Sequence, residues 1–184
     1  NKSAKTTNTE AGIKTFKISS KLVDQMVLVD EGKVCTTMVD LYQNEGIVTE
    51  PAGALSITAL EELSEEIKDK TVVCILSGGN NDILRYPEIM EKSLVYQGRK
   101  HYFIVEFAQK PGQLKKFVNS ALGPTDDIVR FEYIKKNSKE TGPALVGVEL
   151  AKKEDFQPLL SRMDKLGIGY TVLASRDILY SYLI

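Results

Sequence analysis

The chain has 184 residues, of which 42% are hydrophobic and 27% charged, and its net charge is -1. This composition is typical of a globular protein with one large domain or two small ones, and it argues against the strongly basic surface that nucleic-acid binding requires. No apolar run approaches the roughly 20 residues that cross a bilayer, and no signal peptide opens the sequence, so we expect a cytoplasmic protein without a membrane partner.

Cysteine and histidine are scarce, which limits the chemistry available to the chain. Cys35 and Cys74 lie outside any CxxC pair and within apolar surroundings, so we expect two reduced core residues, as in a cytosolic protein. His101 is the only histidine, and it leads into an apolar strand. We therefore predict neither a metal site nor histidine-based catalysis.

The first 30 residues contain only short predicted elements. Residues 1–10 are polar and lack periodicity, so we expect an exposed or disordered lead-in. The alternation over 15–18 predicts a short strand, and Ser19 would then cap a short helix. The apolar run 27–29 predicts a second strand.

A helix followed by a strand and a second helix is predicted next. Apolar residues recur at helical spacing over 31–45, and Gly46 occupies the position where glycine commonly ends a helix. Residues 47–49 predict a short strand. Pro51 suits the first turn of the following helix, which we expect to extend over 52–67.

Residues 72–76 form an apolar run that stops abruptly at Ser77, Gly78 and Gly79. A short β-branched run bounded by glycine predicts a strand covered on both faces of a sheet. Open α/β sheets hold their ligands at the carboxyl ends of such strands, and glycine lets the backbone approach a bound group closely. An ordinary strand-to-loop turn, with Ser77 or Asn80 capping the next helix, explains the same residues equally well.

The remaining elements divide the chain into two predicted domains. Tyr86 and Pro87 start another predicted helix, over 88–96, and a hinge follows over 97–99. These complete an α/β segment, residues 1–97. The second domain, residues 98–184, shows the β-α-β-β-α-β order of a ferredoxin-like fold. Its predicted elements are strand 101–108, helix 113–122, strand 128–135, a polar turn over 137–142, strand 143–150, helix 155–166 and strand 170–174.

Several motifs carry a resemblance to one enzyme family. TTMVDLYQNEGIVTEPAGALS (36–56) and VCILSGGNND (73–82) resemble the C-terminal part of the catalytic domain of biosynthetic threonine deaminases, also called threonine dehydratases or threonine ammonia-lyases. FAQKPGQL, RFEYIKKN and ETGPALVGVEL, within 107–150, resemble the ACT-like regulatory domain of that family. The resemblance implies the end of a fold-type II (tryptophan-synthase-β-like) domain that binds pyridoxal 5'-phosphate, followed by one ACT-like module.

The sequence also departs from the family pattern. The lysine that binds pyridoxal phosphate in this family lies in a Ser-x-Lys-x-Arg-type motif, and a run of glycines holds the phosphate; neither pattern occurs here. The chain therefore resembles a C-terminal fragment, and we expect no catalysis from it alone.

The resemblance implies roles for the residues around the SGGN motif. Ser77 matches the serine that hydrogen-bonds the pyridine nitrogen of the cofactor, and Gly78 and Gly79 let the backbone pass the ring. Glu50 matches an acidic residue near the ring, although a carboxylate at a helix N-terminus is also favoured by the helix dipole alone. Asn80 fits a turn or cap better than a ligand.

The resemblance likewise implies an effector site in the second domain. Glycine at the start of the 113–122 helix exposes backbone N–H groups that suit the carboxylate of an amino acid, and the apolar side of the 128–135 strand suits a branched aliphatic side chain. The implied effectors are isoleucine as inhibitor and valine as its opponent. A tight turn in a packing module is the alternative. The predicted effector-binding residues are Pro111, Gly112, Gln113, Leu114, Phe131 and Tyr133.

Two functions from different classes follow from these patterns. The first is an enzyme segment: the full protein would convert L-threonine to 2-oxobutanoate and ammonia in isoleucine biosynthesis, as a homo-oligomer with amino-acid regulation. The second is a stand-alone ACT-type regulatory protein that binds amino acids without catalysis. A related lyase such as a serine dehydratase fits less well, because those enzymes commonly lack the ACT-like half.

Overall fold

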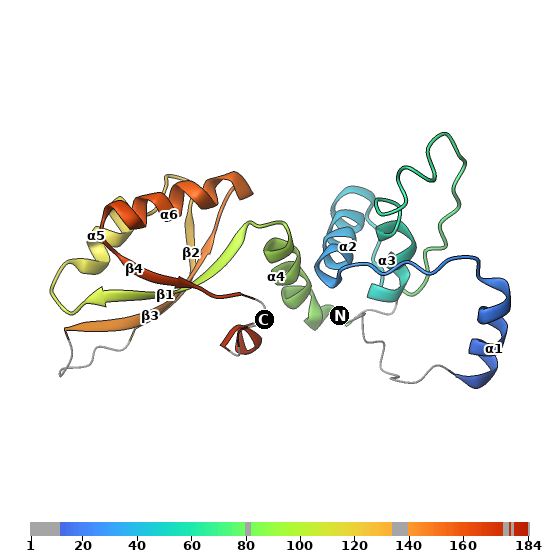
Figure 1. Cartoon of the computed structure of the whole chain (residues 1–184), viewed down its shortest axis with the longest axis horizontal. Helices are drawn as coiled ribbons and strands as arrows, with labels where there is room; N and C mark the ends of the chain where they lie inside the picture. The colour runs from blue at the N-terminus through green and yellow to red at the C-terminus, as the bar shows by residue number, and fades with distance from the viewer. Residues whose placement is uncertain (1–11, 80–81, 134–139, 175–176, 178, 184) are drawn as a thin grey trace. The chain divides into compact units, whose positions relative to one another are not determined.

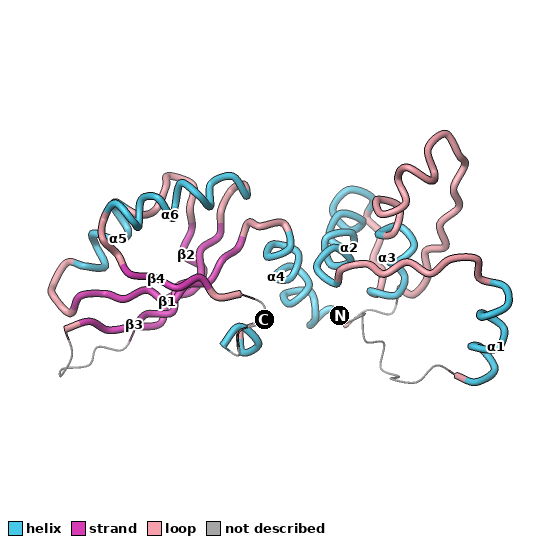
Figure 2. The backbone as a smooth tube through the Cα atoms, viewed as in Figure 1, coloured by secondary structure: helices cyan, strands magenta, loops and turns pink. Residues whose placement is uncertain are grey.

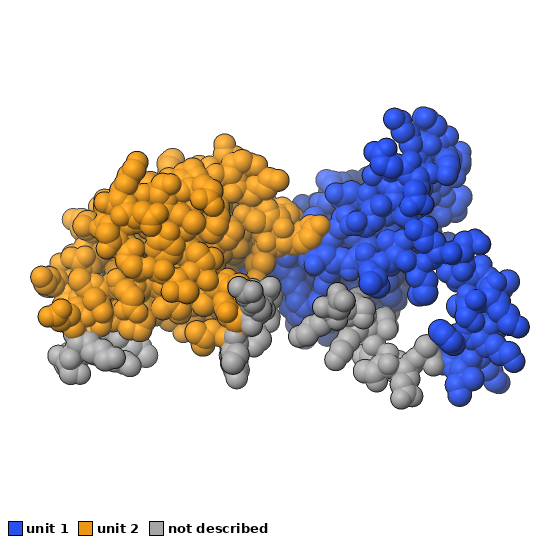
Figure 3. Space-filling view, viewed as in Figure 1, with its two compact units in different colours: residues 1–93 blue, residues 94–184 orange. Residues whose placement is uncertain are grey.

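The computed structural model of the chain describes residues 12–79, 82–133, 140–174, 177 and 179–183 (Figure 1). The lead-in over 1–10, Asn80 and most of the turn predicted over 137–142 lie outside these residues. Helices, strands and loops are distinguished in Figure 2. The chain divides into two compact units, residues 1–93 (unit 1) and 94–184 (unit 2), and the division falls within one helix (Figure 3).

Unit 1 is helical in its described part. Its core is formed by side chains from three helices, and it includes the buried Val34, Met38, Ala54 and Ile89. The elements are α1 (Ile13–Leu22), α2 (Glu31–Glu45), α3 (Pro51–Thr58), the 3-10 helix η1 (Ile83–Arg85) and α4 (Tyr86–Tyr96), which continues into unit 2.

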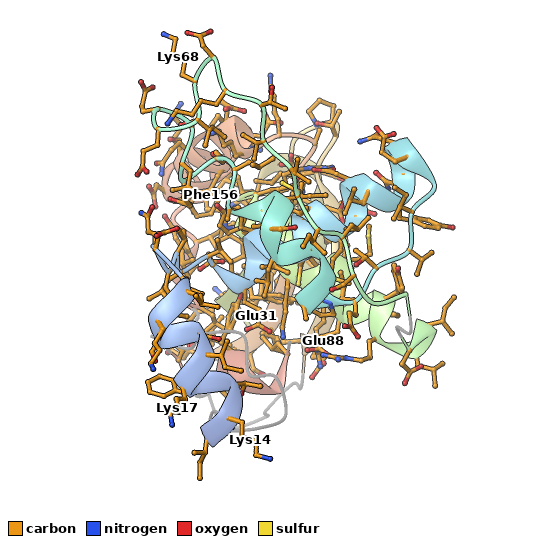
Figure 4. All side chains as sticks on the ribbon, turned by 90° about the vertical axis from the view of Figure 1, so that its right-hand side faces the viewer. Lys14, Lys17, Glu31, Lys68, Glu88 and Phe156 are labelled. Carbon is orange, nitrogen blue, oxygen red and sulfur yellow. The ribbon has the colours of Figure 1, made fainter. Side chains whose placement is uncertain are left out.

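The predictions for α2 and α4 are confirmed. The Asp30 carboxylate accepts a hydrogen bond of 2.7 Å from the backbone N–H of Gly32, which satisfies a free donor at the start of α2. Gly46 ends the helix in the left-handed conformation, with φ 66°. Lys92 in α4 pairs with Glu31 at 2.8 Å and with Glu88 at 2.7 Å, and Figure 4 labels these two carboxylates.

Three strand predictions in unit 1 are wrong. Residues 15–18 lie inside α1, so Ser19 is helical and caps nothing, and residues 27–29 and 47–49 carry no strand. Short alternating runs fit helix and strand about equally, and a helix satisfies its backbone hydrogen bonds without a second segment. A strand requires a neighbouring strand, and the described residues of unit 1 form none.

The helix predicted over 52–67 is shorter than expected. It ends at Thr58, and residues 59–69 continue as a series of turns. The buried Lys33 ammonium of α2 pairs with Glu61 at 3.0 Å and with Glu62 at 2.8 Å. These ion pairs hold the first turn of the 59–69 segment against α2, a tertiary contact that helix propensity does not anticipate.

The buried strand predicted over 72–76 is also wrong. The segment is extended, but the side chains of Val73 and Ile75 are 86% and 78% exposed, and no strand is assigned there. Figure 2 draws it within the long loop that follows α3. Strand propensity produces a ladder only where another strand offers hydrogen bonds, and none of the described residues does so here.

Unit 2 has the predicted β-α-β-β-α-β order, which confirms the ferredoxin-like arrangement. The strand order is β2-β3-β1-β4, every neighbouring pair is antiparallel, and both long helices cover one face of the sheet (Figure 1). The elements are β1 (Lys100–Ala108), α5 (Gln113–Ser120), β2 (Asp127–Tyr133), β3 (Thr141–Glu149), η2 (Lys153–Asp155), α6 (Phe156–Lys165), β4 (Gly169–Val172) and η3 (Leu179–Tyr182).

The core of unit 2 lies between the sheet and its helices. Phe103 in β1 is 1% exposed and stands opposite Val146 in β3 and Val172 in β4. The side chains of Phe117 from α5 and Leu159 from α6 are buried against the same strands. Alternate residues of β1 therefore face the helices, as the period-2 pattern predicts.

Candidate functional site

The loop that carries the SGGN motif is held against α3 and the residues just before it by side-chain hydroxyls. The buried Thr49 hydroxyl lies 3.2 Å from the Ser77 carbonyl oxygen and 3.4 Å from that of Gly78. Ser56 donates a hydrogen bond of 2.8 Å to the carbonyl of Ile75. Two hydroxyl groups thus position the loop in place of a strand ladder.

The structure brings together Glu50 and Gly78, two of the residues predicted to bind the cofactor. The Glu50 backbone N–H donates a hydrogen bond of 2.7 Å to the Gly78 carbonyl. Gly78 has φ 71°, and a Cβ atom at this position would overlap the Glu50 carboxylate. The positive φ favours glycine at this position, and a larger residue would also have to displace the flexible Glu50 side chain. Ser77 and Gly79 flank it and are exposed.

Thr49, Gly53 and Ser56 belong to the same arrangement and were not predicted as part of it. A Cβ atom on Gly53 would overlap the Ser77 carbonyl oxygen and lie 2.8 Å from the Ser77 carbonyl carbon. The glycine of the EPAGA motif is the signal that could have indicated this close approach, since a glycine inside a helix costs stability and needs a packing reason.

Five of the six predicted effector residues line one pocket in unit 2. Its volume is about 180 Å³, which is smaller than the roughly 300–1,000 Å³ of pockets for drug-sized ligands and therefore suits a small metabolite. Its predicted members are Gly112, Gln113, Leu114, Phe131 and Tyr133. Pro111 is exposed and does not line the pocket.

The pocket combines an aromatic wall with polar groups at its mouth. Phe107 packs with ring centroids 6.1 Å from both Phe131 and Tyr133. Gly112 has φ 87° and precedes α5 without a side-chain cap, which leaves backbone N–H groups of the first helical turn without a side-chain acceptor there. Lys110, which was not predicted, adds a cation to the lining.

The remaining candidate groups have structural roles. His101 stacks on Phe156 with ring centroids 3.8 Å apart, and its Nε2 lies 2.8 Å from the Gly98 carbonyl oxygen; burial lowers the pKa of this imidazole. Burial raises the pKa of the Cys35 thiol to about 11, so the reactive thiolate is scarce at neutral pH. Within the described ranges, no three His, Cys, Asp or Glu side chains converge as a metal site, and no helix is long and apolar enough to cross a membrane.

Comparison with known families identifies both units. Residues 2–78 match the family of pyridoxal-phosphate-dependent enzymes, and residues 91–183 match the C-terminal regulatory domain of threonine dehydratase. The class is therefore a pyridoxal-phosphate enzyme segment joined to a regulatory domain with a four-stranded antiparallel sheet. The chain belongs to the threonine dehydratase family.

Curated relatives agree with this assignment. The chain is 52% identical over 169 residues to L-threonine dehydratase biosynthetic IlvA of Halalkalibacterium halodurans, which covers 92% of this chain and 41% of the relative. The protein of the same name from Bacillus subtilis is 50% identical over 173 residues, or 94% of this chain and 41% of the relative. The one from Lactococcus lactis is 49% identical over 173 residues, or 94% and 42%. The chain thus spans about two fifths of the length of these relatives.

Proposed function

We propose that this chain is the regulatory and C-terminal catalytic portion of an enzyme that converts L-threonine to 2-oxobutanoate and ammonia in isoleucine biosynthesis. The observation that carries the proposal is the packing of Gly78 against Glu50. This contact places the segment that bears the Ser77 hydroxyl next to the segment that bears the Glu50 carboxylate. As part of a biosynthetic enzyme, the protein would act in the cytoplasm and assemble as a homo-oligomer. Catalysis would need groups beyond those in this chain.

The residues present fit the ring end of pyridoxal phosphate. Ser77 would hold the pyridine nitrogen, Gly78 and Gly79 would let the backbone pass the ring, and Glu50 would lie beside it. The bound cofactor supplies an electron sink for the α-carbon of the amino acid. A serine hydroxyl is too weak an acid to protonate the pyridine fully, so Ser77 would keep that sink mild and favour elimination over transamination.

Substitution of Ser77 tests this assignment in a full-length enzyme that contains this chain. Ser77→Ala removes one hydrogen bond to the ring, so pyridoxal-phosphate affinity or turnover should fall by about ten-fold at most, the equivalent of roughly 1.4 kcal/mol. Cofactor retention is measured by absorbance after dialysis. Ser64→Ala, in the exposed turn segment after α3, is the matched control. Unchanged affinity and turnover in Ser77→Ala would remove Ser77 from the site.

We propose further that the 180 Å³ pocket binds the regulatory amino acid, isoleucine as inhibitor with valine opposing it. The α5 N-terminus would take the carboxylate, and the wall formed by Phe131 and Tyr133 would take the aliphatic side chain. Pro111 would shape the turn rather than touch the ligand. An effector regulates only if it binds two states unequally, and Gly98, with φ 67° between the proposed domains 1–97 and 98–184, is a candidate hinge for that change.

Gly112→Val tests the effector pocket. The new side chain at φ 87° strains the turn whose backbone lines the pocket, so inhibition by isoleucine should require at least about ten-fold more isoleucine, equivalent to losing a hydrogen bond to a charged group, while uninhibited activity is retained. Gly46→Val is the control, because Gly46 has a similar φ of 66°, has open space around it and lies in unit 1. Equal inhibition of Gly112→Val and the parent enzyme would contradict the assignment.

A stand-alone amino-acid-binding regulator remains the second candidate, supported by the compact fold of unit 2 and its pocket. It predicts isoleucine binding without any cofactor uptake, even when the catalytic portion of a relative is supplied. Uptake of pyridoxal phosphate by that reconstituted protein would reject it.

A further inference from the structure

The Ser77 carbonyl has one hydrogen-bond donor among the described residues, the hydroxyl of Thr49. The two oxygen atoms lie 3.2 Å apart, and Thr49 is only 2% exposed. Two other carbonyl oxygens also lie close to this hydroxyl, that of Gly78 at 3.4 Å and that of Glu50 at 3.2 Å. A hydroxyl carries a single proton, so the three carbonyls compete for it.

The two competing carbonyls have donors of their own. The Gly78 carbonyl accepts a hydrogen bond of 2.7 Å from the backbone N–H of Glu50, and the Glu50 carbonyl accepts one of 3.0 Å from the backbone N–H of Gly53. A buried carbonyl that lacks a donor loses its hydration without compensation. The Thr49 proton is therefore needed most at the Ser77 carbonyl.

The Ser77 carbonyl also packs directly on the backbone of α3. A Cβ atom on Gly53 would overlap both this carbonyl oxygen and the Thr49 hydroxyl oxygen, and Gly53 is itself buried. The peptide that joins Ser77 to Gly78 is thus held by a close contact with α3 and by the hydrogen bond from Thr49. Rotation of this peptide would break both contacts.

The held peptide determines where the Ser77 side chain can point. The torsion ψ of Ser77 relates its carbonyl to its side chain, so once the carbonyl is fixed the hydroxyl retains only the three staggered positions about χ1. Ser77 is exposed, and its hydroxyl bonds to no other residue in the part of the chain that the structure describes. The hydroxyl is therefore available to a ligand, while the backbone that carries it is held in place.

We propose that Thr49 is a positioning residue of the pyridoxal-phosphate site, and that its hydroxyl holds the Ser77 peptide so that the Ser77 hydroxyl faces the pyridine nitrogen. This inference rests on the proposed function, since it names the residue that orients the proposed contact with the cofactor. Thr49 is buried behind the loop and acts only through Ser77. A hydroxyl that is aligned in advance loses less freedom on binding, so cofactor affinity depends on Thr49 as well as on Ser77.

A double-mutant cycle in a full-length enzyme that contains this chain tests the proposal. Thr49→Val keeps the shape of the side chain and removes its hydroxyl, so pyridoxal-phosphate affinity, measured by fluorescence titration, should fall by up to about ten-fold, as for Ser77→Ala. The double variant should bind within about two-fold of the weaker single variant, because both changes remove the same contact. Thr49→Ser keeps the hydroxyl and should bind within about two-fold of the parent enzyme.

The absorption maximum of the bound cofactor gives a second measurement, which does not depend on activity. It should shift in the same direction in Thr49→Val and in Ser77→Ala, because both changes alter the hydrogen bond at the ring nitrogen. Thr58→Val is the matched control: Thr58 is also 2% exposed, and its hydroxyl donates a hydrogen bond of 2.9 Å to the Ala54 carbonyl within α3. This control should change cofactor affinity by less than about two-fold, with or without Ser77→Ala.

The possible outcomes separate this inference from the proposed function. Weaker cofactor binding in Ser77→Ala with unchanged binding in Thr49→Val would overturn the role of Thr49 and leave the cofactor site intact. Losses that multiply in the double variant would also overturn it, because Thr49 would then act independently of Ser77. Unchanged binding in Ser77→Ala would reject the cofactor contact and this inference together.

Circular dichroism verifies the fold of each variant. If Thr49→Val unfolds, Thr49→Cys takes its place, because a thiol has a similar size and is a weaker donor than a hydroxyl. Thr49→Cys should then lower cofactor affinity by less than Ser77→Ala does, and binding equal to that of the parent enzyme would overturn the proposal.

Discussion

Similar apolar runs are buried in unit 2 and exposed in unit 1. Val105 of unit 2 is fully buried between β3 and β4, whereas Val73 of unit 1 is 86% exposed in an extended loop. Both runs are rich in β-branched or aromatic residues, so intrinsic strand preference does not distinguish them. The difference is the presence of neighbouring strands, which turns an extended segment into part of a sheet.

In unit 1, hydrogen bonds from side chains to the backbone hold the extended segment in place of a strand ladder. Thr49 and Ser56 bond to the carbonyls of the 75–78 segment, and Gly53 lets that segment approach α3 closely. Such contacts fix one loop without closing a hydrophobic core. The functional loop of unit 1 is therefore positioned locally, whereas the pocket of unit 2 is formed by a complete packed layer.

Truncation in the two apolar runs should give the largest contrast. Phe103→Ala removes a ring that is 1% exposed from the core of unit 2 and should cost about 3–5 kcal/mol of unfolding free energy. Val73→Ala, at an 86% exposed position, should stay within about 0.5 kcal/mol. Hydrogen exchange of peptides from each unit measures both effects separately. Similar costs for the two variants would mean that Val73 is covered in solution.

Gly53→Ala should give an intermediate effect confined to unit 1. The added methyl group meets the Ser77 carbonyl, which belongs to the backbone and cannot rotate away, so we expect a loss of about 1–3 kcal/mol. Exchange should accelerate in peptides covering 49–58 and 71–79, while unit 2 is unaffected. Ala52→Ser, at an exposed neighbour in α3, is the control. Protection unchanged in Gly53→Ala would contradict the close approach.

The contrast also explains which features the sequence alone could predict. In unit 2, β1 and β3 are nine residues each and pair along their whole length, so a period-2 pattern and the final structure agree. In unit 1, the strand predictions were based on runs of only three to five residues, and the described residues contain no neighbouring strand with which these runs could pair. Length and pairing, rather than composition, separate the correct predictions from the wrong ones.

The candidate sites divide in the same way. The GQL part of the PGQL motif and the alternation that includes Phe131 and Tyr133 predict residues that the fold then brings to one pocket. The contact between Glu50 and Gly78 joins residues 28 positions apart through a loop, so no local pattern could predict its geometry. The roles of Thr49 and Lys110 have the same origin, since each depends on a neighbour that is distant in sequence or on the final turn conformation.

The smallest expected effect concerns the charge cluster between α2 and α4. The hydrogen bond from Lys92 lowers the pKa of Glu88 below its ordinary value of 4.5, which burial opposes only in part. A lowered carboxyl pKa stabilises the fold above the unfolded value, and this contribution is lost as the pH falls through the lowered pKa. Glu88 is 46% exposed, so solvent screens the pair and its contribution is about 0.3–0.5 kcal/mol.

Glu88→Gln should therefore lower the stability of unit 1 by that amount at about pH 7, and the difference from the parent chain should disappear as the pH falls through the lowered pKa of Glu88. Urea unfolding of both proteins across this range, followed by exchange in peptides of unit 1, measures the difference. Glu65→Gln, an exposed residue of the turn segment, controls for the loss of one negative charge. A difference that persisted in acid would show that Glu88 acts through packing. The contact between α2 and α4 would then be stabilised in the same way as the core of unit 2.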